Sequence, residues 1–190
     1  MITDSDWQSF YDRMANSPPR KLLLRTLEHV KKHDLAIDLG CGNLVDTRLL
    51  VTKFKQVEAC DTSPLVQKYV DELAASNLKF RQVSFLEALD TSNADLISAQ
   101  FALPFVDKKE IEEIFRKIPK SLTTGGIFCG HLFGARETQV TDRRCDHTLA
   151  EVEALAHGLE VILIEEIEKD VETLSGLKNK HIFNFILRKQ

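Results

Sequence analysis

Residues 36–44, AIDLGCGNL, decide the fold of this chain. An apolar run ends here in glycines, with Asp38 two residues before Gly40 and a second glycine at Gly42. The pattern is typical of a parallel strand that ends at a ligand, because glycines let the backbone come close and permit positive φ. The loop lacks both the third glycine of a dinucleotide fingerprint and the lysine of a P-loop. It therefore favours a ligand with a cationic group near Asp38 and no diphosphate.

The next strand supports the same kind of ligand. VEACD (residues 57–61) ends at Asp61, about twenty residues after the loop, where an acidic side chain can accept both hydroxyls of a ribose. A ribose with a cationic amine and no phosphate describes S-adenosylmethionine. Other nucleosides that carry an amine remain compatible with the pattern.

Segments typical of strands and helices alternate along the rest of the chain, without repeats or linkers. We expect strands at 35–39, 56–60, 78–83, 94–99, 127–133, 160–167 and 181–187, and helices at 46–54, 62–75, 108–120 and 149–157, with a further helix capped by Ser17. This order predicts a single α/β domain over residues 1–190, with a seven-stranded, mostly parallel sheet and helices on both faces. Only the polar segment 169–180 separates the last two strands, so they should form an antiparallel hairpin at one edge.

The composition excludes several classes of protein. Hydrophobic residues make up 43% of the 190 and charged residues 28%, as in globular proteins, and the net charge of −4 comes without a basic stripe for nucleic acid. No apolar run approaches the roughly 20 residues of a membrane span. Four scattered cysteines suit reduced thiols rather than a disulfide framework or a zinc site. We expect a cytoplasmic protein, a monomer or homodimer, that binds neither nucleic acid, membrane nor metal.

Several stretches together resemble one known family over nearly the whole chain. They are AIDLGCG (36–42), VEACDTSP (57–64), ADLISAQFALPF (94–105) and SLTTGGIFCGHLFG (121–134), with NSPPRKLLL (16–24) and KHIFNFILRK (180–189). The chain is similar to class I S-adenosylmethionine-dependent methyltransferases, which have a Rossmann-like fold. The nearest subgroup is that of the small tellurite-resistance-type and thiopurine-type enzymes, which methylate small soft nucleophiles.

The resemblance implies roles for five residues of the cofactor site. The backbone at Gly40 and Gly42 would face the methionine part of S-adenosylmethionine, with Asp38 close to its amino group. Asp61 would bind the ribose, and Thr62 would line the adenine side.

Two positions depart from the family's motifs. Ser84, followed by Phe85, stands where many relatives place an acidic residue for the adenine amino group, and Leu44 replaces a third glycine. A protein that binds the cofactor without turnover therefore remains an alternative. A nucleotide-dependent oxidoreductase is a second alternative, against which the missing glycine weighs.

The acceptor side is less constrained by the sequence. A nucleophile with a free lone pair needs no general base for displacement at a sulfonium, which agrees with the lack of an obligatory acid–base pair in the sequence. The resemblance to the subgroup above implies a soft acceptor, such as a thiol or a metalloid oxyanion. Gln100 and Phe101 follow the fourth strand and should lie under the methyl group, where Gln100 could orient either the cofactor or the acceptor. Gln100, His131 and Arg20 are the catalytic candidates. AQFALPF (99–105) is not the Asn/Asp-Pro-Pro-Tyr/Phe signature of enzymes that methylate amines, including those of DNA bases.

The N-terminal segment, residues 1–16, is expected to form a lid. Trp7, Phe10, Tyr11 and Met14 fall on one face of a helix. A helix placed ahead of such a sheet can lie across the cofactor cleft. Trp7 and Tyr11, with Arg20 and Phe101, are therefore the expected lid and substrate residues.

Overall fold

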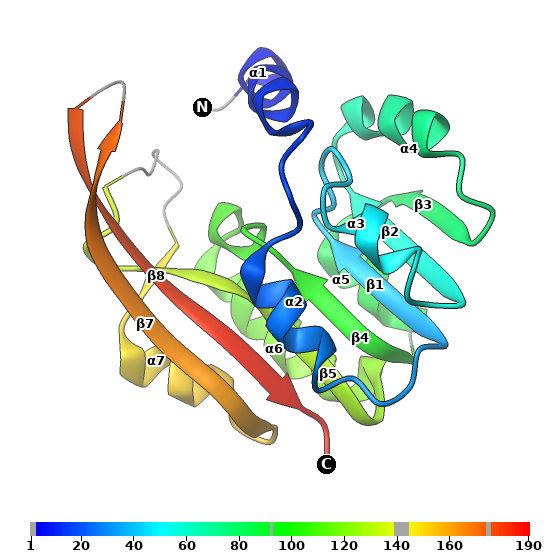
Figure 1. Cartoon of the computed structure of the whole chain (residues 1–190). Helices are drawn as coiled ribbons and strands as arrows, with labels where there is room; N and C mark the ends of the chain where they lie inside the picture. Colours follow the sequence, from blue (N-terminus) through cyan, green and yellow to red (C-terminus); the bar gives the residue numbers. More distant parts are fainter. Residues whose placement is uncertain (1–2, 92, 139–144, 174–175) are drawn as a thin grey trace.

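The fold of this computed structural model is built on one twisted sheet (Figure 1), and the structure describes residues 3–91, 93–138, 145–173 and 176–190. Its strands are β1 (Leu35–Leu39), β2 (Gln56–Asp61), β3 (Leu78–Gln82), β4 (Ala94–Ala99), β5 (Leu122–Gly134), β7 (Glu160–Thr173) and β8 (Gly176–Arg188). They lie in the order β3-β2-β1-β4-β5-β8-β7, and all neighbouring pairs are parallel except those of β8. The predicted α/β fold with an antiparallel last strand is confirmed.

The described residues form eight strands rather than the predicted seven. The additional strand, β6 (Asp146–His147), is parallel to the end of β5 through the pairs Phe133↔Asp146 and Gly134↔His147. Two residues are too short a run for any hydrophobic period to be visible in the sequence.

The last two strands are also longer than predicted. The pairing of β7 with β8 continues through Lys169↔Lys180 to Thr173↔Gly176, so the segment expected to be a polar loop is mostly strand. This part of the hairpin extends past the end of β5 in Figure 1. Among the described residues, no further strand pairs with this part of the hairpin, so its residues can be polar and resemble a loop in sequence.

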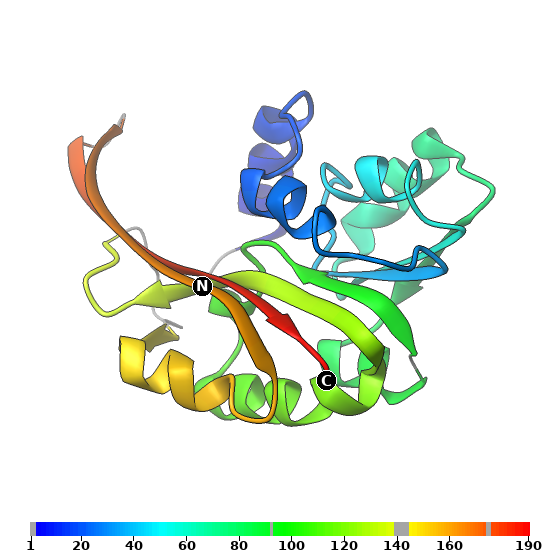
Figure 2. The same cartoon turned by 60° about the horizontal axis from the view of Figure 1, so that its bottom comes forward.

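Helices cover both faces of the sheet (Figure 2). One face carries α1 (Asp4–Met14), α2 (Lys21–Leu27), α3 (Thr47–Leu50) and α4 (Gln67–Leu73), with the 3₁₀ turn η1 (Pro64–Val66). The other carries α5 (Phe85–Ala88), α6 (Lys108–Ser121) and α7 (Leu149–Leu155), with the 3₁₀ turns η2 (Leu89–Thr91) and η3 (Leu103–Phe105) near the strand ends. In the described part of the chain, no helix is long and apolar enough to cross a membrane.

The core has two layers because successive strand residues point to opposite faces. In β5, Phe128 packs toward α6 with Phe185 of β8, whereas its neighbour Ile127 packs toward α2 with Ile186. All four side chains are at most 1% exposed. Both faces of the central strands are therefore sealed, and polar groups concentrate at the strand ends.

The start of α2 differs from the prediction. The helix begins at Lys21 with Arg20 as its N-cap residue, in extended conformation, and no side chain caps it. Ser17, expected to be the cap, instead follows the end of α1, where its N–H donates to the carbonyl of Met14 at 3.0 Å. The prolines at 18 and 19 explain the difference, because a residue that precedes proline disfavours the helical conformation.

Candidate functional site

The glycine loop leaves β1 in the left-handed conformation that its glycines permit. Gly40 has φ +70° and Gly42 has φ +50°. A Cβ on Gly40 would lie 2.4 Å from the Cβ of Ala102, so only glycine fits there. The N–H groups of Gly40 and Cys41 donate to the carbonyl of Cys60 at 2.7 and 3.1 Å, which fixes the loop to the end of β2.

Leu44, at the position of the missing third glycine, keeps a glycine-like backbone. Its φ is +63°, and its side chain is fully buried with Ala59, Val66 and Tyr69. The left-handed conformation costs roughly 1–2 kcal/mol in a residue with a Cβ, and burying a leucine contributes about 1.5–3 kcal/mol. The loop therefore keeps its left-handed conformation at this position although the glycine is absent.

Asp61 joins the end of β2 to the glycine loop. Its Oδ2 accepts from the N–H of Gly42 at 3.0 Å, and its Oδ1 accepts from the N–H of Ser63 at 2.9 Å. Burial raises the pKa of this carboxyl, and the backbone N–H donors act in the opposite direction. Each oxygen keeps a second lone pair, so the carboxylate can still accept from a ligand. Thr62 is exposed beside it, as an adenine-side residue would have to be.

Asp38 lies beneath the loop and is only 2% exposed. The hydroxyl of Thr47 donates to its Oδ2 at 2.5 Å. Burial first, and the neighbouring Asp46 second, raise the pKa of Asp38 to about 7. This carboxyl can therefore take up or lose a proton near neutral pH when a charged group arrives beside it.

Arg20 is engaged with the fold. Its Nη1 lies 3.1 Å from Oδ2 of Asp46, and its backbone N–H donates to Oδ1 of the same carboxylate at 2.8 Å. Both residues lie near Asp38, whose pKa responds to each of them. The predicted substrate residue is thus an ion-pair partner under the glycine loop.

Ser84 begins α5 as its N-cap residue. Its hydroxyl donates to Glu87 Oε2 at 2.7 Å, and the N–H of Glu87 points back to Ser84 Oγ at 3.4 Å, which makes a capping box. The next residue, Phe85, places its ring against Gly40, with Cζ 3.2 Å from where a Cβ would be. Phe85 therefore contacts the glycine loop directly, whereas the hydroxyl of Ser84 is already used.

Gln100 lies at the carboxyl end of β4 and is 6% exposed. Its Nε2 donates to Ser98 Oγ at 3.2 Å and to Cys129 Sγ at 3.3 Å. Its Oε1 is buried and has no hydrogen-bond partner. A buried acceptor without a partner is costly in an empty fold, so Oε1 is a candidate contact for a bound ligand.

Phe101 and His131 form one unit next to Gln100. Phe101 has φ +55°, and its ring stacks on His131 with centroids 3.9 Å apart. The N–H of Phe101 donates to Nδ1 of His131 at 3.3 Å, so the imidazole proton is on Nε2. Burial, followed by the nearby Lys180 and Arg20, lowers the pKa of His131 to about 3. His131 is therefore a neutral hydrogen-bond donor and a poor base.

Helix α1 covers the glycine loop from outside. A Cβ on Gly42 would lie 3.0 Å from Cε1 of Tyr11, and the carbonyl of Tyr11 accepts from Asn43 Nδ2 at 2.8 Å. Trp7 stacks on Tyr11 with centroids 5.9 Å apart and contacts Phe105 edge-on at 5.2 Å. The two aromatic residues expected in a lid are thus held on the loop itself.

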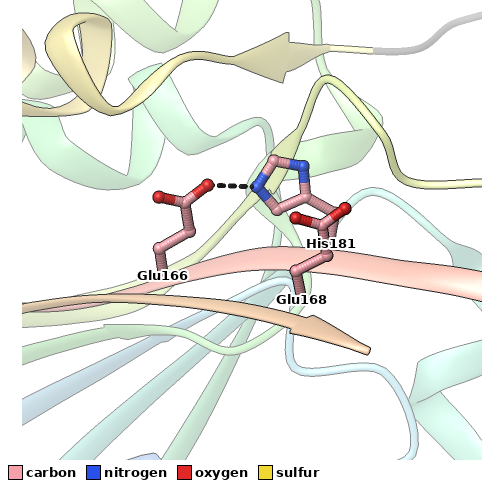
Figure 3. Close-up of side chains that lie close together, drawn as sticks. All are labelled: Glu166, Glu168 and His181. Atoms are coloured by element: carbon pink, nitrogen blue, oxygen red, sulfur yellow. Dashed lines mark hydrogen bonds and ion pairs between the residues drawn. The ribbon is translucent and has the colours of Figure 1, made fainter. Parts of the chain in front are cut away.

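A second cluster of titratable side chains lies on the β7–β8 hairpin (Figure 3). One ligand atom from each of Glu166, Glu168 and His181 lies within 4.8 Å of the others. However, the guanidinium of Arg136 binds both oxygens of Glu168 at 2.6 Å, and the N–H of Arg136 donates to Nδ1 of His181 at 3.1 Å. The proton of His181 is therefore on Nε2, which donates to Glu166 at 2.8 Å and leaves no lone pair for a metal. The cluster is an ion-pair network.

Known proteins share a domain family and a fold with this chain. Residues 36–126 match the family described as "Methyltransferase domain". TehB from Haemophilus influenzae has a similar structure, with a TM-score of 0.80 and 13% identity over 95% of this chain and 66% of that chain. The N-methyltransferase NodS from Bradyrhizobium japonicum WM9, in complex with S-adenosyl-L-homocysteine, has a TM-score of 0.69 and 15% identity over 96% of this chain and 97% of that chain. No curated protein sequence matches the chain.

The chain thus has the fold of S-adenosylmethionine-dependent methyltransferases, and its residues 36–126 match the methyltransferase domain family. The oxidoreductase alternative does not agree with this family match. The residues fit the cofactor: Gly40 lies where a Cβ would clash, the carboxylate of Asp61 has spare lone pairs, and Oε1 of Gln100 lacks a partner.

Some residues at these strand ends were not found from the sequence. Asn43 and Thr47 support Tyr11 and Asp38 through single hydrogen bonds that no local pattern indicates. Lys180 lies near Phe101 but belongs to the segment interpreted as a loop. His147 lines a surface hollow with Lys108 and Glu151 on the α6–α7 side of the sheet.

Proposed function

We propose that this enzyme methylates a small soft nucleophile, either a thiol or a metalloid oxyanion. The observation that carries the proposal is the state of His131. With a pKa of about 3 and its Nδ1 lone pair used by the N–H of Phe101, His131 does not accept a proton from an acceptor. A thiol that has ionised to the thiolate in solution, or a metalloid oxyanion, arrives with no proton on its nucleophilic atom, so its methylation does not need a base in the site.

The chain's own residues bind the cofactor and orient the reacting groups. S-adenosylmethionine supplies an electrophilic methyl group on a sulfonium. Asp61 accepts from the ribose hydroxyls, the backbone of Gly40 and Gly42 lies against the methionine part, and Asp38 in its ionised form pairs with the ammonium. Gln100 Oε1 and the donor Nε2–H of His131 then orient the reacting groups. Alignment and exclusion of water are sufficient for such a displacement.

Helix α1 acts as the lid that excludes this water. Tyr11 and Trp7 cover the glycine loop, and Arg48 Nη1 donates to the carbonyl of Ala15 at 2.9 Å just after the helix. The structural similarity to TehB supports a soft acceptor, since tellurite-resistance-type enzymes form the subgroup that the sequence resembles.

Asp61→Ala tests the cofactor site. We expect S-adenosylhomocysteine to bind with a free energy weaker by about 1.5–3 kcal/mol, the scale of hydrogen bonds to a charged group. Isothermal titration calorimetry measures the change. Asp71→Ala, which removes an exposed carboxylate from α4, serves as the control and should bind normally. Unchanged affinity in Asp61→Ala would show that the ribose is placed wrongly.

A screen of methyl acceptors tests the reaction itself. Thiols, selenite, tellurite, small amines and small acids should be compared, with S-adenosylhomocysteine formation as the readout. We expect turnover with thiols or metalloid oxyanions and none with amines. Cofactor binding without turnover on any of them would contradict the proposal and favour a binding protein.

A further inference from the structure

Lys180 brings a cation to the carboxyl end of β4 from the far end of the chain. It precedes Ile182 and Asn184 on the same face of β8, and its Nζ lies 5.2 Å from the centroid of the Phe101 ring. The β7–β8 hairpin and α1 both extend beyond the end at which β1 and β4 finish (Figure 1). The lysine is thus a neighbour of the Phe101–His131 unit although 79 positions separate it from Phe101 in the sequence.

The charge of Lys180 is poorly compensated. The side chain is partly buried, and among the described residues no carboxylate forms an ion pair with it. Its register partner across the hairpin is another cation, Lys169, and like charges directly opposite each other are unfavourable. Burial first, and Lys169 second, lower the pKa of Lys180, while Glu137 acts in the opposite direction.

On the side of Phe101, the groups near this lysine are a hydrogen-bond donor and an aromatic face. His131 presents a neutral ring whose proton is on Nε2, and Phe101 holds a left-handed backbone conformation, φ +55°, that a residue with a Cβ adopts only at a cost. Nearby, Oε1 of Gln100 is buried without a partner. The carboxyl end of β4 thus gathers four unusual groups. They are the partly buried cation of Lys180, the neutral donor of His131, the unpaired acceptor of Gln100 and the strained backbone of Phe101.

We propose that Lys180 and the Nε2–H of His131 bind an anionic group of the methyl acceptor against the ring of Phe101. This inference rests on the proposed function and narrows it, because an acceptor that carries an anionic group should then bind more tightly than a neutral one. Two sources share this chemistry: a thiol that carries a carboxylate, and the oxyanion of a metalloid. A charged donor and a neutral donor to the same oxyanion group form short, strong hydrogen bonds.

A binding experiment tests the site without turnover. Mercaptoacetate, selenite and the neutral thiol 2-mercaptoethanol are titrated into the full chain with S-adenosylhomocysteine, while the imidazole resonances of His131 are followed by NMR. We expect at least one anion to shift the His131 signals and 2-mercaptoethanol to leave them in place. A response to mercaptoacetate alone assigns the carboxylate source, and a response to selenite alone assigns the oxyanion source. No response to either anion, or an equal response to 2-mercaptoethanol, overturns the proposal.

Variants of two lysines on the hairpin test whether the charge of Lys180 itself binds the anion. Lys180→Gln should weaken anion binding by about tenfold, that is about 1.4 kcal/mol, and Lys180→Arg should retain most of it. Lys178→Gln removes the same charge two residues nearer the hairpin tip and should behave as wild type. If Lys178→Gln weakens binding as much as Lys180→Gln, the effect is one of general charge and the specific site is wrong.

Kinetics distinguish this inference from the proposed function. In Lys180→Gln, the KM for the anionic acceptor should rise by about tenfold, whereas kcat and the KM for 2-mercaptoethanol should stay close to wild type. Equal KM changes for charged and neutral acceptors would overturn the role of Lys180 while methyl transfer stands. Failure of S-adenosylhomocysteine to bind would overturn the proposed function, and the His131 titration would still decide on the anion site.

Discussion

The ionisation of Asp38 lowers the free energy of unfolding of the protein, by an amount that depends on pH. Its pKa is about 7 in the folded protein, compared with 3.8 for an unperturbed aspartate, because it is buried and lies near Asp46. Between these values the folded state holds a proton that the unfolded state has lost. The contribution of Asp38 to stability is therefore intact at low pH and is lost as the pH rises from about 4 to about 7.

Asp38→Asn removes this titration and keeps an acceptor for Thr47. The free energy of unfolding of the variant should gain on that of wild type as the pH rises from 5 to 8, by about 3 kcal/mol, because about two of the three pKa units of the shift lie above pH 5. Urea denaturation at both pH values, without cofactor, gives the comparison. Parallel pH profiles for the two proteins would mean that Asp38 is ionised in the folded state.

At this scale the sequence predicts which residues end the strands, but not how they pair. The spacing of Asp38, Gly40 and Gly42 indicates the loop because it follows from one continuous segment. The ion pair between Arg20 and Asp46 joins residues 26 positions apart, and it depends on how α2 packs over the loop. From the sequence alone, Arg20 is therefore interpreted as a substrate residue, because the sequence does not show that Asp46 is its ion-pair partner.

Helix α1 carries a tryptophan whose fluorescence can report on ligand binding. Trp7 is the only tryptophan of the chain, and it lies between Tyr11 and Phe105. Because Tyr11 contacts Gly42, any ligand at the glycine loop must change the surroundings of Trp7 if α1 is the lid.

The lid therefore predicts a fluorescence response. Adding S-adenosylhomocysteine should change the intensity or emission maximum of Trp7, with a midpoint that matches the calorimetric Kd. Trp7→Phe should lose the signal and keep an aromatic ring in place. Calorimetric binding with no change in the emission of Trp7 would show that α1 lies apart from the cofactor.

The hairpin shows where hydrophobic periodicity stops being informative for an element. From Glu160 to Ile167 the strand borders the core and its apolar residues reveal it, but beyond Lys169 the pairing continues with mostly polar residues on both strands. Main-chain hydrogen bonds hold this extension, and they leave no mark on composition. Lys180 could therefore not be placed near Phe101 before the pairing was known.

For the whole molecule, the antiparallel insertion of β8 between β5 and β7 decides how the core closes. Phe185 of β8 is fully buried and lies 5.0 Å from Phe128 of β5 and 5.4 Å from Phe115 of α6, measured between ring centroids. The sequence predicts this arrangement well, because strands that alternate with helices and end in a hairpin permit few topologies.

Phe185→Ala tests the importance of that closure. We expect the free energy of unfolding to fall by about 3–5 kcal/mol, through lost burial and the cavity left between three aromatic rings. Urea denaturation monitored by circular dichroism measures it, and Leu24→Ala, on the 47% exposed side chain of α2, is the matched surface control. A loss comparable to that of the control would mean that the aromatic cluster repacks without β8.

The position of β8 also has a consequence during synthesis on the ribosome. The chain emerges with its N-terminus first, so β5 and β7 are complete before the residues that pair with both of them exist. Until the last thirteen residues of the sheet are released, both strands present open edges that other nascent chains can pair with. A chain cut before β8 would therefore keep every predicted cofactor residue and lack the strand that joins β5 to β7.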